Sequence, residues 1–262
     1  MGQGHHGMIT NLVGPSGIGK DIKPFVFLDF IHGVPPKGAG FGWHPHSGIA
    51  TFTYYIDGGS DLEESTGNKV AFRAGDIEYL QAGSGAWHKG MLLKDQPTLG
   101  FQLWISLPPE LETADAKSVY VTADKIVSND RFKVLLGEHE GIKSKIEPPN
   151  DMNYLDINLR ADEEWTYTPP KTHDLLWLVV YKGMFGGGLV VTVGELVVFE
   201  EGNQPIEFSS DHGSNFLLGS GKKFEHDLVV GRSSIHTSKV NLEASHKKIN
   251  KIYSDFIITA FK

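Results

Sequence analysis

Three histidines in the first half of the chain have the residue type and spacing of a metal-binding set. His44 and His46 are separated by one residue, and His88 follows the Gly75-Asp76 turn further along the chain. Alternate residues of a β-strand point to the same face, so His44 and His46 project together if this segment is extended. Imidazole is a suitable ligand for Fe, Ni, Cu and Zn. The pattern therefore indicates a metal site inside a β-barrel.

The segments around these histidines have the alternation expected of strands. Residues 49–56 form one such segment, and a Gly-rich turn follows it. We expect its even-numbered side chains, among them Phe52 and Tyr54, to share the face of His44 and His46. The first half is therefore predicted to form a barrel of short strands. The further strands expected in this half cover residues 70–72, 77–80, 87–93 and 101–107.

Five blocks of the first half resemble the pirin family, which belongs to the cupin superfamily. The blocks cover residues 24–29, 44–48, 67–68, 75–88 and 102–108. Their order and spacing agree with those of pirins from about residue 20 to residue 110. The resemblance implies an all-β fold of two tandem cupin-type β-barrels (the double-stranded β-helix) with a C-terminal helix. It also implies that His44, His46 and His88 are metal ligands.

One feature of the pirin site is missing from this sequence. The pirin shell is similar to three histidines and one glutamate, and the glutamate lies two residues after the third histidine. Here that position is Gly90, and the other cupin glutamate position, four residues after the second histidine, is Ala50. The resemblance thus carries over the three histidines and no carboxylate. A fourth ligand from elsewhere stays open, and Gln102 is a candidate from its place in the last strand of the barrel.

The expected cofactor is a divalent metal, with Fe(II) as the leading choice and Ni, Zn, Mn or Cu as alternatives. A three-histidine site leaves coordination positions open to water or substrate. Some pirins act as quercetin-type 2,3-dioxygenases, so the resemblance implies an oxygenase that acts on a small enolisable or diol substrate. We expect the pocket to be lined by Phe52, Tyr54 and Leu92. Other pirins resemble metal-tuned partners of transcription factors or metabolic enzymes, so the alternative is a non-catalytic binding or regulatory protein.

Composition limits the kinds of partner. The 262 residues include 24 basic and 32 acidic side chains, for a formal charge of −8. Direct nucleic-acid binding is not expected, because it depends on neutralising phosphates. The sequence has no cysteine, which excludes disulfides and thiolate ligands. No apolar run is long enough for a membrane span, and no signal peptide is recognised, so a cytoplasmic location is expected. The expected partner is a small-molecule substrate or another protein.

The predicted organisation is an N-terminal barrel over residues 1–125 and a degenerate C-terminal barrel over residues 131–262. The second half has no two histidines at positions i and i+2, so we expect it to bind no metal. Its other histidines, including His139, His173 and His236, are interpreted as solvated or hydrogen-bonded. A helix is predicted over residues 238–256. The strands expected in this half cover residues 132–136, 154–159, 175–181, 189–193, 195–199 and 215–218, with a turn at 186–188.

Overall fold

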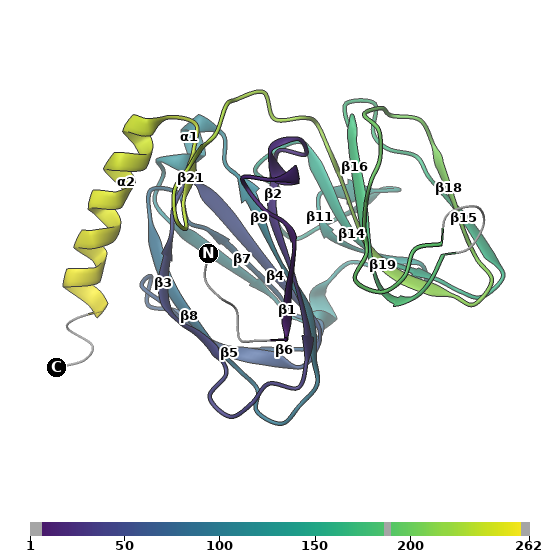
Figure 1. The fold of residues 1–262 in the computed structure, drawn as a ribbon, viewed down its shortest axis with the longest axis horizontal. Coiled ribbons are helices and arrows are strands. Elements are labelled where there is room, and N and C mark those ends of the chain that lie inside the picture. Colours follow the sequence, from purple (N-terminus) through teal and green to yellow (C-terminus); the bar gives the residue numbers. More distant parts are fainter. Residues whose placement is uncertain (1–6, 186–189, 258–262) are drawn as a thin grey trace. The chain divides into compact units, whose positions relative to one another are not determined.

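The computed structural model describes residues 7–185 and 190–257, which form two compact units (Figure 1). Unit 1 consists of Met1–Ala123 together with Glu225–Lys262, and unit 2 is Asp124–Phe224. The fold is all-β with one long helix near the C-terminus, as expected. The division differs from the expected domain 131–262, because the last part of the chain packs with unit 1. Helical periodicity shows which face of a helix is apolar, but not which barrel that face covers.

Unit 1 is built from a six-stranded and a four-stranded antiparallel sheet. The six-stranded sheet has the order β1-β2-β9-β4-β7-β10, and the four-stranded sheet has the order β3-β8-β5-β6. A cluster of buried apolar side chains contributed by both sheets lies inside, formed by Ile31, Tyr55, Leu62 and Phe72. The strands are β1 Ile9–Val13, β2 Phe25–Gly33, β3 Gly40–His46, β4 Ile49–Asp57, β5 Gly59–Glu64, β6 Lys69–Arg73, β7 Ile77–Gln81, β8 Ala86–Leu92, β9 Thr98–Ser106 and β10 Lys117–Val121. The short helices are η1 Ile18–Lys20, α1 Pro109–Glu112 and η2 Ala123–Lys125.

The inward face of β4 is the odd-numbered one, so the expected face was wrong. Thr53 and Tyr55 line the interior cavity of unit 1, whereas Phe52 and Tyr54 are buried on the opposite face of the strand. The cause is Gly48, where the chain leaves one sheet for the other. Its φ is +70°, and a Cβ there would lie 1.9 Å from the main-chain oxygen of Ile235. Such a turn resets the alternation, so the face of β3 cannot be extrapolated into β4.

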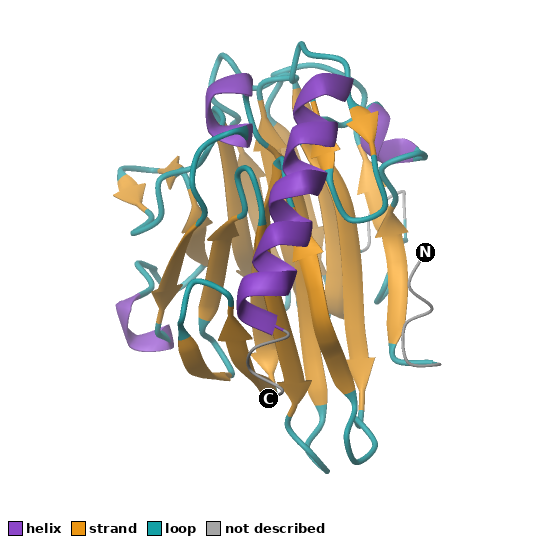
Figure 2. Cartoon of the chain, turned by 90° about the vertical axis from the view of Figure 1, so that its left-hand side faces the viewer, coloured by secondary structure: helices purple, strands orange, loops and turns teal. Residues whose placement is uncertain are grey.

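The last segment of the chain packs with unit 1: Ile235 contacts Val26 and Ile49 of the six-stranded sheet, and the helix contacts β8 of the four-stranded sheet. It contains β20 Val229–Val230, β21 Ile235–His236, α2 Lys239–Ile252 and the π-helical turn η3 Tyr253–Ile257. Ser238 caps α2 by accepting a hydrogen bond from the Asn241 amide. Helix α2 runs beside β3 in Figure 1 and lies in front of the strands, at a tilt to them, in Figure 2, with Leu242 and Ile249 on its buried face. Trp87 Nε1 on β8 donates to the Ile249 main-chain oxygen at 3.0 Å. The predicted helix is therefore present, and it braces β8.

Unit 2 contains a five-stranded sheet of order β11-β14-β19-β16-β17 and smaller two-stranded pairs. A cluster of buried aromatic and aliphatic side chains in this unit includes Phe132, Trp165 and Phe216. The pair of β15 and β18 was not expected, and Leu189 of the expected strand 189–193 and the turn 186–188 lie outside the described residues. The strands are β11 Phe132–Leu136, β12 Glu138–His139, β13 Ile142–Lys143, β14 Met152–Leu159, β15 Glu163–Tyr167, β16 Leu175–Gly183, β17 Leu196–Val198, β18 Ile206–Ser210 and β19 Ser214–Gly221.

Within residues 7–185 and 190–257, no helix has both the length and the apolar character needed to cross a membrane.

Candidate metal centre

The three predicted histidines come together in unit 1 because two neighbouring strands carry them. In the antiparallel pair of β3 and β8, His44 lies directly opposite His88, and His46 lies opposite Ala86. The pairing is irregular between Phe41 and His44, at the end of β3 that leads into the site. Cross-strand neighbours and next-but-one neighbours share a face of a sheet, so all three rings point inward.

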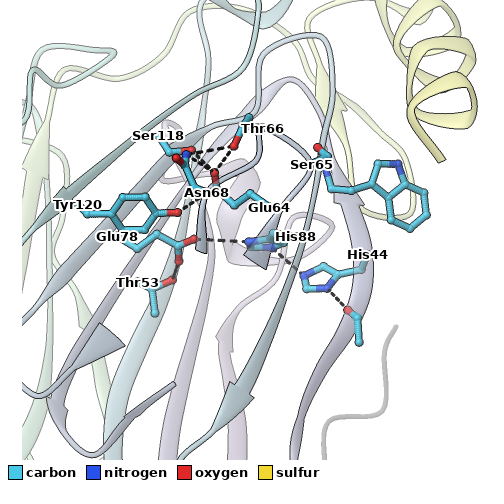
Figure 3. Close-up of polar contacts among 12 residues, drawn as sticks. His44, Thr53, Glu64, Ser65, Thr66, Asn68, Glu78, His88, Ser118 and Tyr120 are labelled. Carbon is cyan, nitrogen blue, oxygen red and sulfur yellow. Dashed lines mark hydrogen bonds and ion pairs between the residues drawn. The ribbon is translucent and has the colours of Figure 1, made fainter. Parts of the chain in front are cut away.

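The three rings converge on one position. One ligand atom from each ring lies within 4.8 Å of the others. His44 Nε2 is 2.9 Å from His88 Nε2, and Figure 3 shows these two rings in contact. The ring of His46 stands nearly perpendicular to that of His44, with 5.0 Å between their centroids. The expected convergence of His44, His46 and His88 is thus present, and no other group of three such residues is found in the described parts of the chain.

Main-chain oxygens fix the orientation of two of the rings. His44 Nδ1 lies 2.7 Å from the Gly42 oxygen, and His46 Nδ1 lies 3.2 Å from the Ser233 oxygen. A carbonyl oxygen only accepts, so each Nδ1 carries the proton and each Nε2 presents a lone pair. The His46 Nε2 atom is buried and has no hydrogen-bond partner. Histidine ligands of metals have this arrangement, with one nitrogen free and the other donating to an oxygen.

Burial keeps these imidazoles neutral. It lowers the pKa of His44 to about 3, and the nearby His88 adds to this effect against a smaller opposing contribution from the Gly42 oxygen. The pKa of His46 is also held well below its ordinary value, by burial first and then by the two neighbouring imidazoles. Neutral imidazole is the form that binds a metal.

The donor set fits a divalent metal. Two nitrogens each about 2.1 Å from one ion, at right angles, are roughly 3 Å apart. His44 Nε2 and His88 Nε2 are 2.9 Å apart. Two Nε2 lone pairs at that distance repel each other unless a cation or a proton lies between them. The spacing of these nitrogens, the neutral rings of His44 and His46 and the unpartnered His46 Nε2 are therefore what a divalent ion with three imidazole ligands requires.

A small cavity adjoins the histidines. Its volume is about 30 Å³. That is the space of a water molecule or a diatomic molecule, and it is about a tenth of the volume of ordinary small-molecule pockets. Gln102 lines this cavity, but Phe52 and Tyr54 do not, and neither does Leu92, which packs against the interior apolar cluster. The lining residues are Ile31, Phe41, His44, Thr53, Tyr55, Ser60, Leu62, Glu78, His88, Gly90 and Gln102.

Gly90 lies beside His88 on the inward face of β8. Both residues line the cavity, as their spacing predicts. A Cβ built on Gly90 would lie 2.9 Å from Leu62 Cδ2 and 3.8 Å from Ser60 Oγ. The Leu62 side chain therefore fills part of the space that a side chain at position 90 would need.

Two buried glutamates were missed in the sequence. Glu78 lies on β7 and lines the cavity, with Oε1 3.5 Å from His88 Nδ1. Glu64 was interpreted with Glu63 as a solvated pair, but it is only 2 % exposed. Its carboxylate accepts hydrogen bonds from four side chains (Figure 3), those of Thr66, Asn68, Ser118 and Tyr120. For Glu78 the available signal was a glutamate between the apolar residues Ile77 and Tyr79 of a short strand.

A second buried polar network ties β3 to the end of the chain. Ser47 Oγ donates to Ser234 Oγ at 2.8 Å and lies 3.0 Å from His236 Nε2. On the other side of the ring, His236 Nδ1 lies 3.5 Å from Glu112 Oε2. Ser47, His236 and Glu112 are all completely buried, so a substrate has no access to the serine. The network joins the residue after His46 to the residue after Ser233, and it stabilises this contact.

His139 and His173 of unit 2 contact other protein side chains. His173 Nδ1 is 2.8 Å from Ser220 Oγ, and its Nε2 is 3.0 Å from Asp151. The His139 ring packs among Phe132, Trp165 and Tyr167.

Comparisons with known proteins agree with this architecture. A family model described as Pirin matches residues 9–105. The pirin of Homo sapiens is 30% identical over 220 residues, which cover 80% of this chain and 75% of that protein. A pirin-like protein of Solanum lycopersicum is 29% identical over 205 residues, which cover 72% of this chain and 70% of that protein.

Solved structures show the same fold. A quercetin 2,3-dioxygenase from Acinetobacter baumannii superposes with a TM-score of 0.83 at 20% identity and covers 93% of this chain and 90% of its own. A bacterial pirin from Escherichia coli, in complex with nickel(II), has a TM-score of 0.68 at 20% identity and covers 84% of this chain and 94% of its own. The identity to the human protein, together with the two barrels and the three converging histidines, leads to one conclusion. The chain belongs to the pirin family of the cupin superfamily.

Proposed function

We propose that this chain is a metal-dependent oxygenase of the quercetin 2,3-dioxygenase type, acting on a small enolisable or diol substrate. The observation that carries the proposal is the convergence of three imidazoles, each with Nε2 directed at one position beside a cavity. His44, His46 and His88 would hold a divalent ion there. The nickel complex of the Escherichia coli pirin supports a metal of this charge. Fe(II) is our first choice of metal, and Ni, Zn, Mn and Cu are the alternatives.

When bound, a divalent metal supplies positive charge and open coordination positions for O₂ and for the oxygens of an ionised diol or enol. The residues of the cavity divide the remaining tasks. Ile31, Phe41 and Leu62 exclude water from one side. Gln102 offers a polar side chain that can orient a substrate oxygen.

The cavity volume limits the substrate. A space of about 30 Å³ admits O₂ or the reacting edge of a small molecule, but not a whole flavonol. The bulk of a larger substrate would have to lie outside the cavity. Position 90, where pirins have a glutamate, is glycine and supplies no base of its own, and losing a positioned base costs about 10²–10⁴ in rate. A substrate that is already ionised at neutral pH is therefore favoured.

The same small cavity favours a second candidate function, that of a metal-dependent binding or regulatory protein without catalysis. In that case the ion would stabilise the barrel, and the partner would be a protein. Both candidate functions use the metal site of His44, His46 and His88. They differ in whether the protein converts a substrate.

One experiment separates the two functions. The purified chain is analysed for metal by mass spectrometry, and O₂ uptake is followed with quercetin and a panel of smaller diols and enols. Uptake that disappears in the His44→Ala/His46→Ala variant supports the oxygenase. A full complement of metal without uptake across the panel supports the binding protein. A chain that takes up none of the five metals after reconstitution contradicts both.

A further inference from the structure

We propose that Glu78 is a positioning residue for His88: its carboxylate accepts a hydrogen bond from His88 Nδ1 and keeps Nε2 turned toward the metal position. The inference rests on the proposed metal site and assigns to that site a residue outside the three histidines. It concerns binding of the metal alone, so it can fail while the oxygenase proposal stands.

The first argument is that Glu78 and His88 face each other and have no alternative. Glu78 Oε1 lies 3.5 Å from His88 Nδ1, and the two side chains are 1 % and 4 % exposed. Neither of these two atoms has a hydrogen bond to any other group. Buried polar groups are almost always paired, so two that face each other inside one barrel are natural partners. A displacement of a few tenths of an ångström brings them to ordinary hydrogen-bond distance.

The second argument is that Glu78 is held in place for this contact. In the pairing of β4 with β7, Thr53 lies directly opposite Glu78. Thr53 Oγ1 donates to Glu78 Oε2 at 2.7 Å, which anchors one oxygen and leaves the other directed at His88 (Figure 3). An anchored carboxylate can fix the ring of its neighbour.

The third argument comes from the other two rings of the site. His44 and His46 each turn Nδ1 toward a main-chain oxygen, from Gly42 and Ser233. His88 turns the same atom toward Glu78, so each of the three rings has one oxygen behind it. A carboxylate makes an imidazole a stronger ligand than a carbonyl oxygen does.

Charge supports the same assignment. Among the described residues that line the cavity, Glu78 has the only carboxylate, and no Lys or Arg in the described part of the chain pairs with it. A buried carboxylate without a cationic partner is unfavourable. A divalent ion held by His88 would provide the opposite charge one imidazole away.

The test compares Glu78 with Glu64, another buried glutamate of unit 1. Binding of Ni²⁺ alone is measured by titration calorimetry for wild type, Glu78→Ala, Glu78→Gln and Glu64→Gln. We expect Glu78→Ala to raise Kd about 10–100-fold, as other variants that remove a carboxylate behind a ligand histidine do. Glu78→Gln keeps an oxygen that can accept from His88, so it should recover part of the affinity. Glu64 lies opposite His88 in the pairing of β5 with β8, but its carboxylate bonds Thr66, Asn68, Ser118 and Tyr120 and no histidine. Glu64→Gln should therefore leave Kd within about threefold of wild type.

Two outcomes would overturn the proposal: a Kd for Glu78→Ala within about threefold of wild type, or equal losses in Glu78→Ala and Glu64→Gln. If Glu78→Ala does not fold, the proposal can still be tested on the wild-type protein by NMR. Nitrogen-15 NMR of the histidine rings in the Zn²⁺-loaded protein should show His88 protonated on Nδ1, with Nε2 bound to the metal. Binding of Zn²⁺ through His88 Nδ1, with Nε2 protonated, would equally overturn the assignment.

Discussion

His46 Nδ1 lies 3.2 Å from the main-chain oxygen of Ser233, a residue 187 positions later in the chain. The contact is held by its neighbours, because the Ile235 amide donates to the Ser47 oxygen at 3.1 Å and Ser47 pairs with Ser234 in a parallel bridge. A candidate metal ligand of the first barrel is thus oriented by a segment that follows the whole of unit 2 in sequence.

We predict that metal binding slows hydrogen exchange of the Ile235 amide. The metal fixes His46, and the hydrogen bond from Ile235 to Ser47 then opens less often. Exchange is measured by NMR with and without Zn²⁺. The Gly231 amide, which donates to Ser234 within the same segment, is the control and should change little. Equal protection of both amides would show a general stabilisation of the segment instead.

Replacing His44 and His46 together by Ala should abolish metal binding, and the wild type should hold no more than one ion per chain. A single remaining imidazole does not retain a divalent ion against water. Metal content by mass spectrometry, after reconstitution and removal of free metal, gives both numbers. The matched control is His173→Ala, which removes a buried histidine of unit 2 that bonds Ser220 and should leave metal content unchanged. Full metal content in the double variant would mean that the ion binds elsewhere.

Gly90→Glu should raise metal affinity, because it adds a carboxylate to the cavity beside His88. The same change crowds Leu62, whose Cδ2 would lie 2.9 Å from the new Cβ, so we expect a loss of about 1–3 kcal/mol in the free energy of unfolding.

Gly90→Ala introduces the same crowding without a carboxylate and serves as the control for affinity. Calorimetry with Ni²⁺ and urea unfolding of the metal-free proteins separate the two effects. If Gly90→Glu and Gly90→Ala bind Ni²⁺ equally, the carboxylate does not reach the metal.

Stability should depend on pH through Glu112. Burial raises the pKa of this carboxyl, but contacts with His236, Asn241 and Thr237 outweigh that effect and leave the pKa lowered from its ordinary 4.5. A lowered pKa in the folded state means that the contribution to stability is complete above pH 4.5. The contribution is lost as the pH falls through the lowered pKa, where the folded protein must take up a proton.

Glu112→Gln should therefore reduce the free energy of unfolding at pH 7 by about 1–3 kcal/mol, through the loss of charged hydrogen-bond acceptance. Urea unfolding of wild type and variant at pH 7 and pH 3.5 tests this. The difference between them should shrink at the lower pH, and a difference that is constant with pH would contradict the mechanism.

The sequence was sufficient to predict the fold class and the convergence of the His44, His46 and His88 side chains. Their spacing translates directly into geometry, because strand alternation places His44 and His46 on one face whatever the rest of the fold does. The same rule failed for Phe52 and Tyr54, since the turn at Gly48 moves the chain to the other sheet and alternation does not survive it.

Contacts between different strands and segments could not be predicted in this way. Glu78 on β7 lies 3.5 Å from His88 on β8, and the Ser233 oxygen lies near His46, from which it is separated by 187 positions in the chain. Neither relationship has a periodic signature, because both depend on which surfaces pack together. The position of helix α2 in the sequence was predicted correctly, but the helix was assigned to the second barrel and packs with unit 1. The sequence pattern does not show which surface a helix will pack against.

The contact between His46 and Ser233 also has a consequence for protein synthesis. Ribosomes make the chain from its N-terminus, so β3 and β8 are complete while unit 2 and the segment from residue 225 onward have yet to be translated. A nascent chain that ends at Phe224 has all three histidines but lacks the oxygen that orients one of them. We therefore expect a chain that ends at Phe224 to bind Ni²⁺ less tightly than the full chain, because nothing in it orients the His46 ring.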